Sequence, residues 1–414
     1  MAIEALEDRW LLSTIYVDAS SPGPTRNGTS WGSALADLQL ALGAAVSGDT
    51  IRVAEATYKP TSGTDRTKTF QLKTGVGVYG GYAGYGAANA DARNVMAYPT
   101  ILSGDIGTVG SNTDNSYHVV VSGGTTSTAV LDGFTITAGN ANGTNPNNSG
   151  GGIYNSSGSP TIRNCTLIRN TAASGGGMYD YYSSPTLINC IFNGNTASSG
   201  GGIFNDLSSS PTLTNCAFSG NSAASGGGMY DYFYSTLINC TFSGNRASTT
   251  GGGIYGSRAA LINCIVWGNT APYLSEVSGS GQISGPATVT YSDVQGGWSG
   301  TGNVNIDPQF VCNPSGINYG DLRLLVTPLS LCVDSGNNAA IPSGITTDLA
   351  GNPRRQDIAS ITDTGRGTAP IVDMGAYEAS PGPLAVSGGP YTVLETSSVV
   401  LSGAGYSDTG LTLS

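Results

Sequence analysis

Short apolar stretches alternate with stretches rich in glycine and asparagine along the middle of the chain, and this pattern repeats at a nearly constant interval. Five copies begin with three glycines, at Gly150, Gly175, Gly200, Gly226 and Gly251, so they start 25 or 26 residues apart. A fixed period of this length indicates one supersecondary unit per copy, which buries its apolar side only by stacking on its neighbours. The pattern therefore predicts a solenoid.

The apolar stretches inside each copy are too short for helices. Examples are Ile153-Tyr154, Thr186–Ile188 and Ile191-Phe192, each bounded by Gly, Asn, Ser or Pro. A helical solenoid would need runs of about ten or more residues with a 3.6-residue period, and none fits between the glycines and asparagines. Three short strands and three bends per 25 residues predict one coil of an all-β, right-handed parallel β-helix.

An asparagine supplies one bend in each coil. Cys190 and Phe192 share one face of a strand, whereas Leu187 has the opposite parity, so all three point inward only if the chain bends between them. Asn189 fits this bend because asparagine tolerates the left-handed region. Stacking then predicts two ladders of asparagine side chains. Within each ladder, successive amides lie about 4.8 Å apart and donate from coil to coil. The first ladder contains Asn164, Asn189, Asn215, Asn239 and Asn263, and the second contains Asn170, Asn195, Asn221, Asn245 and Asn269.

The same register places five cysteines in one internal column. Metal ligands converge on a tetrahedral point, whereas parallel side chains in a stack do not. Cβ atoms at the strand spacing are also farther apart than the roughly 3.8 Å that a disulfide prefers. The cysteines are therefore predicted to be reduced and to pack as small apolar side chains. The column contains Cys165, Cys190, Cys216, Cys240 and Cys264, and it lies beside Leu167, Phe192, Phe218, Phe242 and Val266.

A helix and irregular coils precede the regular repeats. Apolar residues at a helical spacing between Trp31 and Ala45 predict one helix, which would cap the open strand edge of the first coil. We divide the chain into an export segment (1–13), a cap with irregular coils (14–125), the regular β-helix (126–306), a C-terminal segment (307–379) and a linker with the start of an incomplete β-sandwich (380–414).

Composition and charge exclude two classes of partner. Charged residues make up only 10% of the chain, its net charge is −11 and its pI is about 4.4. An acidic protein is not expected to bind nucleic acid or an anionic membrane. The sequence has no run of about 20 apolar residues, so it predicts no membrane-spanning helix. These properties fit an exported protein.

Two segments near the N-terminus resemble parts of exported proteins. IEALEDRWLLS, from Ile3 to Ser13, resembles the LEDR-type segment of exported planctomycete proteins, which implies export to the cell surface and processing near Ser13. An ordinary amphipathic helix is the alternative. GTSW, a helix and GDTI resemble the leading segment of extracellular right-handed β-helix proteins, some of which are polysaccharide lyases.

Later motifs resemble bacterial surface proteins. The GGG[IM] and F-x-x-N elements resemble the repeats of polymorphic outer-membrane proteins, which act as adhesins. DPQF, LCVDSG, TDLAGNPR and VDMGAYE, between Asp307 and Glu378, resemble the choice-of-anchor Q segment, which implies a location and no chemistry. The tail from Gly388 resembles the start of a cadherin-like or PKD-like sandwich. We favour the interpretation that the chain is a fragment of a longer surface protein, and the alternative is that these strands pair elsewhere.

One polar column beside the glycine triplets is predicted to lie on the outer face. Carboxylates of Asp180 and Asp231, two coils or about 10 Å apart, could hold calcium or approach the spacing of an inverting glycosidase. The neighbouring aromatic rings could stack on sugars. Alternatively, the polar residues cap bends and the tyrosines form a half-exposed ladder. The column contains Asn155, Asp180, Asn205, Asp231 and Gly256, flanked by Tyr181, Tyr182, Tyr232, Phe233 and Tyr234.

Candidate catalytic bases are few. The resemblance to lyases implies a Lys, Arg or His base, but the chain has one histidine, His118, and three lysines, Lys59, Lys68 and Lys73, all before the regular repeats. His118 is predicted to be a strand residue, and we assign no catalytic residue. In the C-terminal segment, a calcium or salt-bridge cluster and simple turn capping both remain open for Asp334, Asp348, Asp373 and Glu378, with Arg354 and Arg355. Pairing of Cys312 with Cys332 also remains open.

The favoured function is a non-catalytic exported protein of the cell surface or envelope, with a structural, stalk or adhesive role. Its partners would be an extracellular polysaccharide or other surface proteins, and its strand edges would allow self-assembly. The alternative is a carbohydrate-active protein that binds or cleaves a polysaccharide at the face containing Asp180, Asp231 and the tyrosines. No cofactor is predicted, and calcium is left open.

Overall fold

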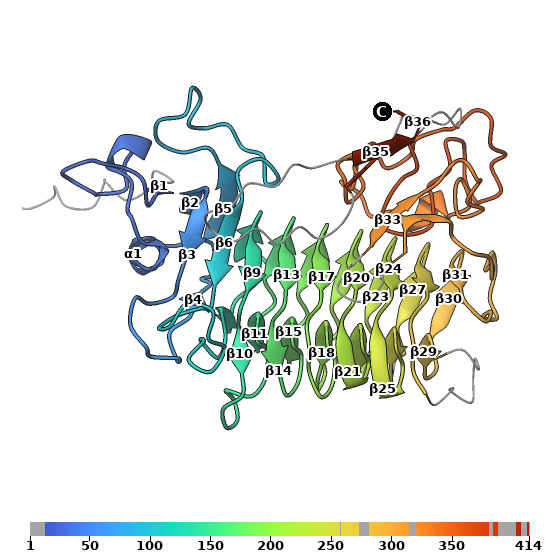
Figure 1. Cartoon of the computed structure of the whole chain (residues 1–414), viewed down its shortest axis with the longest axis horizontal. Coiled ribbons are helices and arrows are strands. Elements are labelled where there is room, and N and C mark those ends of the chain that lie inside the picture. Colours follow the sequence, from blue (N-terminus) through green and yellow to red (C-terminus); the bar gives the residue numbers. More distant parts are fainter. Residues whose placement is uncertain are drawn as a thin grey trace, which may run out of the picture.

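The computed structural model describes residues 13–256, 258–272, 281–313 and 320–380, together with the backbone of three short strands closer to the C-terminus. The predicted export motif therefore lies almost entirely outside the described residues. Figure 1 shows a long stack of coils with a helix, α1, near one end and a C-terminal segment lying over the other end.

Three parallel sheets run along the stack, and successive coils contribute strands to each. The ten-stranded sheet contains β1 Thr14–Val17, β2 Thr50–Ala54, β5 Gly77–Tyr82, β8 Val130–Asp132, β12 Thr161–Arg163, β16 Thr186–Ile188, β19 Thr212–Thr214, β23 Thr236–Ile238, β27 Ala260–Ile262 and β30 Thr288–Thr290. The nine-stranded sheet contains β3 Ala56–Tyr58, β6 Thr100–Ser103, β9 Thr135–Thr137, β13 Thr166–Ile168, β17 Ile191–Asn193, β20 Ala217–Ser219, β24 Thr241–Ser243, β28 Ile265–Trp267 and β31 Asp293–Val294. The eight-stranded sheet contains β4 Phe70–Gln71, β7 Val120–Gly123, β11 Ile153–Ser156, β15 Met178–Tyr181, β18 Ile203–Asn205, β22 Met229–Asp231, β26 Ile254–Tyr255 and β29 Ile283–Ser284.

Smaller elements complete the fold. Two parallel pairs join β10 Asn140–Ala141 to β14 Thr171–Ala172 and β21 Ser222–Ser225 to β25 Arg246–Thr250. The C-terminal part contains the antiparallel pair β32 Phe310–Cys312 and β33 Asp321–Leu324, and the antiparallel strands β34 Leu384–Ser387, β35 Gly403–Tyr406 and β36 Thr412–Leu413. The three long parallel sheets, to which successive coils contribute strands, make the chain a right-handed parallel β-helix, as predicted.

The bend asparagines adopt the predicted left-handed conformation, with φ between 49° and 56° at Asn164, Asn189, Asn215, Asn239 and Asn263. Asn189 Nδ2 donates to Asn164 Oδ1 at 3.2 Å and Asn215 Nδ2 donates to Asn189 Oδ1 at 3.0 Å. The ladder is interrupted at Asn239, whose Nδ2 donates at 2.9 Å to the carbonyl oxygen of Asp373. The first ladder therefore forms in two parts, because the C-terminal segment takes one of its donors.

The second asparagine ladder is continuous. Amide hydrogen bonds of 2.8 to 3.1 Å connect Asn170, Asn195, Asn221, Asn245 and Asn269 in order. All five side chains are buried. Each amide also donates to a backbone carbonyl of an earlier coil, so the ladder satisfies polar groups that would otherwise be unpaired in the core.

The predicted cysteine column is also present. Its five thiols are free and at most 1% exposed. Beside it, the rings of Phe192, Phe218 and Phe242 stack with centroids 4.6 and 4.3 Å apart and planes within 3° of parallel. The core is therefore built from identical side chains in adjacent coils, as the register predicted.

The glycine triplets fit where two stretches of backbone approach closely. A Cβ atom added at Gly201 would lie 2.5 Å from the carbonyl oxygen of Gly227 and 2.6 Å from that of Ser222. A side chain at this position would separate the coils. The triplet is therefore a requirement of the stacking and gives no information about a ligand.

The N-terminal cap is shorter than predicted. The range Trp31–Ala45 contains a 3-10 helix, η1, at Trp31–Ser33 and the α-helix α1 at Leu38–Ala44. The Asp37 carboxylate caps α1 by accepting from the amide of Gln39 at 2.8 Å, so the helix begins only after Asp37. Buried side chains of α1 join the core of the coils. Within the described ranges, no helix has the length and hydropathy that crossing a bilayer requires.

The C-terminal segment packs on the outer side of the nine-stranded sheet. Ala217 of β20 and Ile265 of β28 belong to the same apolar cluster as Phe310, Val333 and Met374. A second 3-10 helix, η2, lies at Asn338–Ala340. Figure 1 shows this segment lying over one end of the stack of coils, and its acidic residues are described below.

The two cysteines outside the column do not pair. No disulfide joins Cys312 and Cys332. Cys332 is buried and its Sγ lies 3.4 Å from Asp293 Oδ2, to which it donates. Burial raises the pKa of the Cys332 thiol, and the nearby Asp293 carboxylate adds to the effect.

Candidate functional site

The predicted outer column of acids and amides points into the β-helix. Side chains alternate along β11, so Ile153 is buried, Tyr154 faces outward and Asn155 is buried again. Strand pairing aligns Asn155 with the equivalent residues of the next three coils. The prediction that this column lies on the surface is therefore wrong, because the two-residue period of the strand turns it inward. Relative exposure is 0% at Asn155, Asp180, Asn205 and Asp231, and the column ends at the partly exposed Gly256.

Hydrogen bonds connect the inward column in pairs. Asn155 Nδ2 donates to Asp180 Oδ1 at 2.7 Å, and Asn205 Nδ2 donates to Asp231 Oδ1 at 3.1 Å. Asp180 Oδ2 and Asn205 Oδ1 are buried without a hydrogen-bond partner, although the two residues are aligned in adjacent strands. A proton on Asp180 Oδ2 would let this oxygen donate to Asn205 Oδ1 and join the two pairs into one ladder.

Burial sets the acid–base behaviour of these carboxyl groups. It raises the pKa of Asp180 to about 7, and the charge of Asp231 adds to this, while the hydrogen bond from Asn155 opposes it. Burial also raises the pKa of Asp231 to about 6, against the hydrogen bonds from Ser235 and Asn205. Both carboxyl groups are fully buried and face the core, so the pair does not form the predicted surface site for calcium or glycoside hydrolysis.

An aromatic ladder that was not predicted covers the outward side of the same strands. Ring centroids of successive members lie 4.7 to 5.6 Å apart, and the planes of Tyr154 and Tyr179 are within 6° of parallel. The faces of stacked rings cover one another, so this ladder presents mainly ring edges to solvent. The alternation of Ile or Met with Tyr or Phe after each glycine triplet was the available signal. The ladder contains His118, Tyr154, Tyr179, Phe204, Tyr230 and Tyr255.

The bend that follows the aromatic ladder carries the exposed rings. Tyr182, Tyr232 and Tyr234 are 51%, 53% and 56% exposed, and Leu207 is 44% exposed. We call Tyr181, Tyr182, Leu207, Tyr232 and Tyr234 the bend surface. It spans three successive coils, which are joined here by a hydrogen bond from the Tyr182 amide to the Leu207 carbonyl and by one from the Tyr232 amide to the carbonyl at position 205.

Ring contacts at the bend surface differ from those in the ladder. Tyr181 and Tyr182 meet edge to face, with centroids 4.6 Å apart and planes at 78°. Tyr232 meets Phe204 in the same way, at 5.8 Å and 79°. A perpendicular arrangement leaves more ring face uncovered than a parallel stack does. The predicted tyrosines are therefore accessible, in contrast to the acids predicted beside them, and Phe233 between them is partly exposed.

The charges next to the bend surface are of both signs. Asp206 Oδ2 accepts from the hydroxyl group of Tyr179 at 2.7 Å. Arg258 Nη1 donates to the hydroxyl group of Tyr234 at 2.6 Å, and its guanidinium lies 5.6 Å from the centre of that ring. This surface therefore combines aromatic rings, hydroxyl groups and one charge of each sign.

The candidate bases His118, Lys68 and Lys73 contact other groups of the protein. His118 is 6% exposed, its Nδ1 lies 3.0 Å from the carbonyl oxygen of Gly150 and its ring stacks on Tyr154. Burial lowers the pKa of His118, so its imidazole is neutral at pH 7. Lys73 donates to the backbone carbonyls of Gly43 and Ala45 at the end of α1. Lys68 forms an ion pair of 3.7 Å with Asp65.

A family model agrees with the fold of the repeats. Residues 105–271 match the family described as the right-handed beta helix region. The structure is similar to that of a pectate lyase, with 14% sequence identity and a TM-score of 0.43 over 89% of this chain and 98% of that chain. It is also similar to a pectin methylesterase from Erwinia chrysanthemi, with 10% identity and a TM-score of 0.36 over 70% of this chain and 81% of that chain. No curated protein matches the sequence.

Proposed function

We propose that this protein is a non-catalytic, exported β-helix that binds an extended polysaccharide at the bend surface. The observation that carries the proposal is the set of half-exposed tyrosines at this bend, with Tyr182 in one coil, Tyr232 and Tyr234 two coils further on, and the exposed Leu207 in the coil between them. Its role on this proposal is that of a rigid adhesive or structural module at the cell surface.

The chemistry of the bend surface fits a sugar chain. Tyrosine offers an apolar ring face for the C–H groups of a sugar and a hydroxyl group for hydrogen bonding. Coils repeat at the strand spacing of about 4.8 Å, so Tyr182, Leu207 and the pair Tyr232 and Tyr234 form an irregular row roughly 10 Å long along the β-helix axis. A row of this kind suits an extended polymer better than a compact ligand, which would need a deep pocket.

Charge favours a neutral polysaccharide. The net charge of −11 repels a polyanion at long range. The charged neighbours of the bend surface, Asp206 and Arg258, have opposite signs, so they add little attraction for either kind of ion. We therefore expect binding to depend only weakly on salt concentration.

The buried acids support a role in binding over one in catalysis. General acid–base chemistry requires a carboxyl group within hydrogen-bond reach of the sugar, at about 3 Å. Asp180 and Asp231 are fully buried and face the core. Their contribution on this proposal is to the packing of the coils that present the tyrosines.

Affinity electrophoresis or calorimetry with a panel of neutral and uronate polysaccharides tests the proposal. If each of three rings contributes about 1 kcal/mol, the triple substitution Y182A/Y232A/Y234A lowers the affinity for the bound polysaccharide roughly 100-fold. Tyr85→Ala is the matched control, because Tyr85 is a tyrosine of the N-terminal part that is 47% exposed. Equal loss in both variants, or binding of no polysaccharide by the wild-type chain, would refute the proposal.

A parallel assay addresses the alternative, a carbohydrate-active enzyme. The ultraviolet absorbance of an unsaturated product reports on lyase action, and a reducing-sugar assay reports on hydrolysis. We expect neither product from the wild-type protein. Product formation that disappears in Asp180→Asn would replace the binding proposal with the catalytic one.

A further inference from the structure

Three carboxylates of the C-terminal segment meet outside the sites described so far. One oxygen each from Asp334, Asp357 and Asp363 lies within 4.8 Å of the other two. Asp334 is fully buried, whereas Asp357 and Asp363 are exposed. Among the residues that the structure describes, none of the three belongs to an ion pair with Lys or Arg. The cluster therefore concentrates negative charge without a protein cation to balance it.

The side chain of Asp334 has no hydrogen-bond partner. Both of its carboxyl oxygens are buried and unpartnered. Hydrogen bonds hold the backbone of Asp334 in place. Its amide donates to Asp373 Oδ1 at 2.7 Å, and its carbonyl oxygen accepts from the amides of Thr364 and Gly365. A buried carboxylate in this situation is strongly disfavoured unless a cation compensates it.

Of the other acids in the same segment, Asp348 and Asp373 are satisfied by the protein, whereas Glu378 has one buried oxygen, Oε2, without a hydrogen-bond partner. Asp348 accepts from the amides of Ala350 and Asn352 on one oxygen and from the amide of Glu378 on the other. Asp373 accepts from backbone amides on both of its oxygens, and Glu378 Oε1 lies 3.4 Å from Arg354 Nε. Asp348 and Asp373 therefore cap turns and Glu378 forms an ion pair, and among the described residues these three acids do not gather into a metal-binding group. Asp334, the fourth acid considered with them, differs in having no donor.

The geometry of the three carboxylates suits one hard cation. Calcium binds oxygen at about 2.4 Å, so two of its ligands are at most about 4.8 Å apart, which is the bound that the three oxygens meet. All three donors are carboxylate oxygens, which favour calcium or magnesium over zinc. We propose that Asp334, Asp357 and Asp363 bind a calcium ion.

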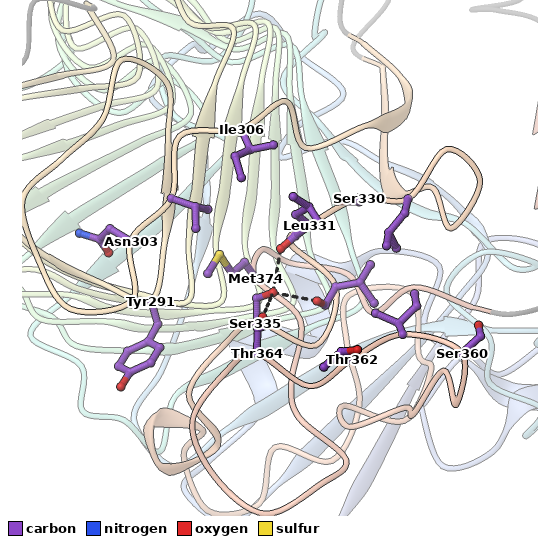
Figure 2. Close-up of a pocket in the computed structure, with 15 residues that line it drawn as sticks. Tyr291, Asn303, Ile306, Ser330, Leu331, Ser335, Ser360, Thr362, Thr364 and Met374 are labelled. Atoms are coloured by element: carbon purple, nitrogen blue, oxygen red, sulfur yellow. Dashed lines mark hydrogen bonds between the residues drawn. The ribbon is translucent and has the colours of Figure 1, made fainter.

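Water has access to the side of this cluster. A cavity of about 540 Å³ lies beside the chain segments that carry two of the acids (Figure 2). Its lining includes Val333 and Ser335, the neighbours of Asp334. It also includes Thr362 and Thr364, the neighbours of Asp363. Calcium needs six to eight oxygen ligands, and because Asp357 and Asp363 are exposed, solvent water supplies those that the three carboxylates do not. Ser335 and Thr364 are also joined by a hydrogen bond of 2.9 Å between their hydroxyl groups.

The bound ion would fasten a loop to the segment that packs on the β-helix. Asp357 and Asp363 bracket a short loop with a hydrogen bond from the amide of Ile361 to the carbonyl of Ile358. Ile358 and Val333 belong to the apolar cluster that includes residues of the nine-stranded sheet. Calcium therefore neutralises the unpartnered carboxylate of Asp334 and stabilises the docked C-terminal segment. This role is independent of polysaccharide binding.

Isothermal titration calorimetry of the full chain with calcium chloride, after treatment with a chelator, tests the site. We expect one calcium per chain and an increase in the midpoint of thermal unfolding. The double substitution D357N/D363N removes two exposed ligands, so the chain should fold while its calcium affinity falls at least about 100-fold. Glu55→Gln with Asp307→Asn is the matched control, because it removes two exposed carboxylates elsewhere and should leave binding unchanged.

Three results would overturn the proposal. These are no calcium binding by the wild-type chain at millimolar concentration, retention of the site in D357N/D363N, and equal loss in the control variant, which would indicate a diffuse charge effect. Titration with magnesium chloride then identifies the ion. Tighter binding of magnesium than of calcium would contradict the assignment to calcium.

Discussion

Replacement of Asp180 by asparagine is expected to stabilise this protein, and the effect should depend on pH. The side chain is fully buried, accepts one hydrogen bond from Asn155 on Oδ1 and has an unpartnered Oδ2. An asparagine has the same shape as the protonated acid, and its Nδ2 group donates to Asn205 Oδ1 at every pH. The substitution therefore completes the inward ladder without requiring a proton.

The magnitude follows from the pKa of Asp180. An aspartate in the unfolded chain titrates near 3.8, whereas burial raises the pKa of Asp180 in the folded chain to about 7. The folded state thus retains a proton that the unfolded state loses, and the stability of the wild-type protein falls as the pH rises from about 4 to about 7. A difference of about 3 pH units corresponds to on the order of 4 kcal/mol above pH 7, and to almost nothing below pH 4.

Urea unfolding followed by circular dichroism at pH 4 and at pH 8 measures this difference. Asp180→Asn should match the wild-type free energy of unfolding within about 1 kcal/mol at pH 4 and exceed it by several kcal/mol at pH 8. Asp65→Asn serves as a control of opposite sign, because hydrogen bonds from Thr67 lower the pKa of Asp65 on the surface. That substitution should slightly destabilise the protein at pH 8.

The reasoning about the inward ladder fails if Asp180→Asn destabilises the protein at pH 8. It also fails if the gain in stability is the same at pH 4 and pH 8, since a titrating carboxyl group requires a difference. A cooperative transition is needed for this comparison, and repeat proteins can lose cooperativity along the stack. The slope of the unfolding curve in each variant checks this condition.

Two further substitutions test the core of the coils. Phe218→Ala should lower the free energy of unfolding by about 3 to 5 kcal/mol in urea titrations, because its ring stacks on Phe192 and Phe242 and no group fills the space it leaves; a loss below about 1 kcal/mol would contradict this. Asn221→Ala should cost roughly 2 to 3 kcal/mol because it leaves buried amides of the second ladder unpaired, whereas Asn193→Ala, at a partly exposed position, should cost less; equal costs would refute the ladder's role.

Repetition made most of the fold predictable from the sequence. Equivalent residues in successive copies occupy equivalent places, so the period fixed the coil and the parity around Asn189 fixed which residues face inward. The cysteine column and the second asparagine ladder follow from that register. The candidate site was only half predictable. The same parity rule, applied from Ile153 onward, would have shown that Asp180 faces the core and Tyr179 faces outward.

Other features depend on contacts between distant parts of the chain. The donation from Asn239 to the carbonyl of Asp373 joins residues 134 positions apart, and no local pattern signals it. The grouping of Asp334 with Asp357 and Asp363 likewise arises because a loop folds back beside the docked segment.

The sequence by itself determined the coil, its length, its bends and its internal columns, because each of these depends on neighbouring residues and on copies that stack in register. Only the tertiary structure decided where the C-terminal segment packs, which ladder it interrupts and which acids it brings together. Those contacts join segments without a common period, so their geometry is set by packing between surfaces and not by any repeat in the chain.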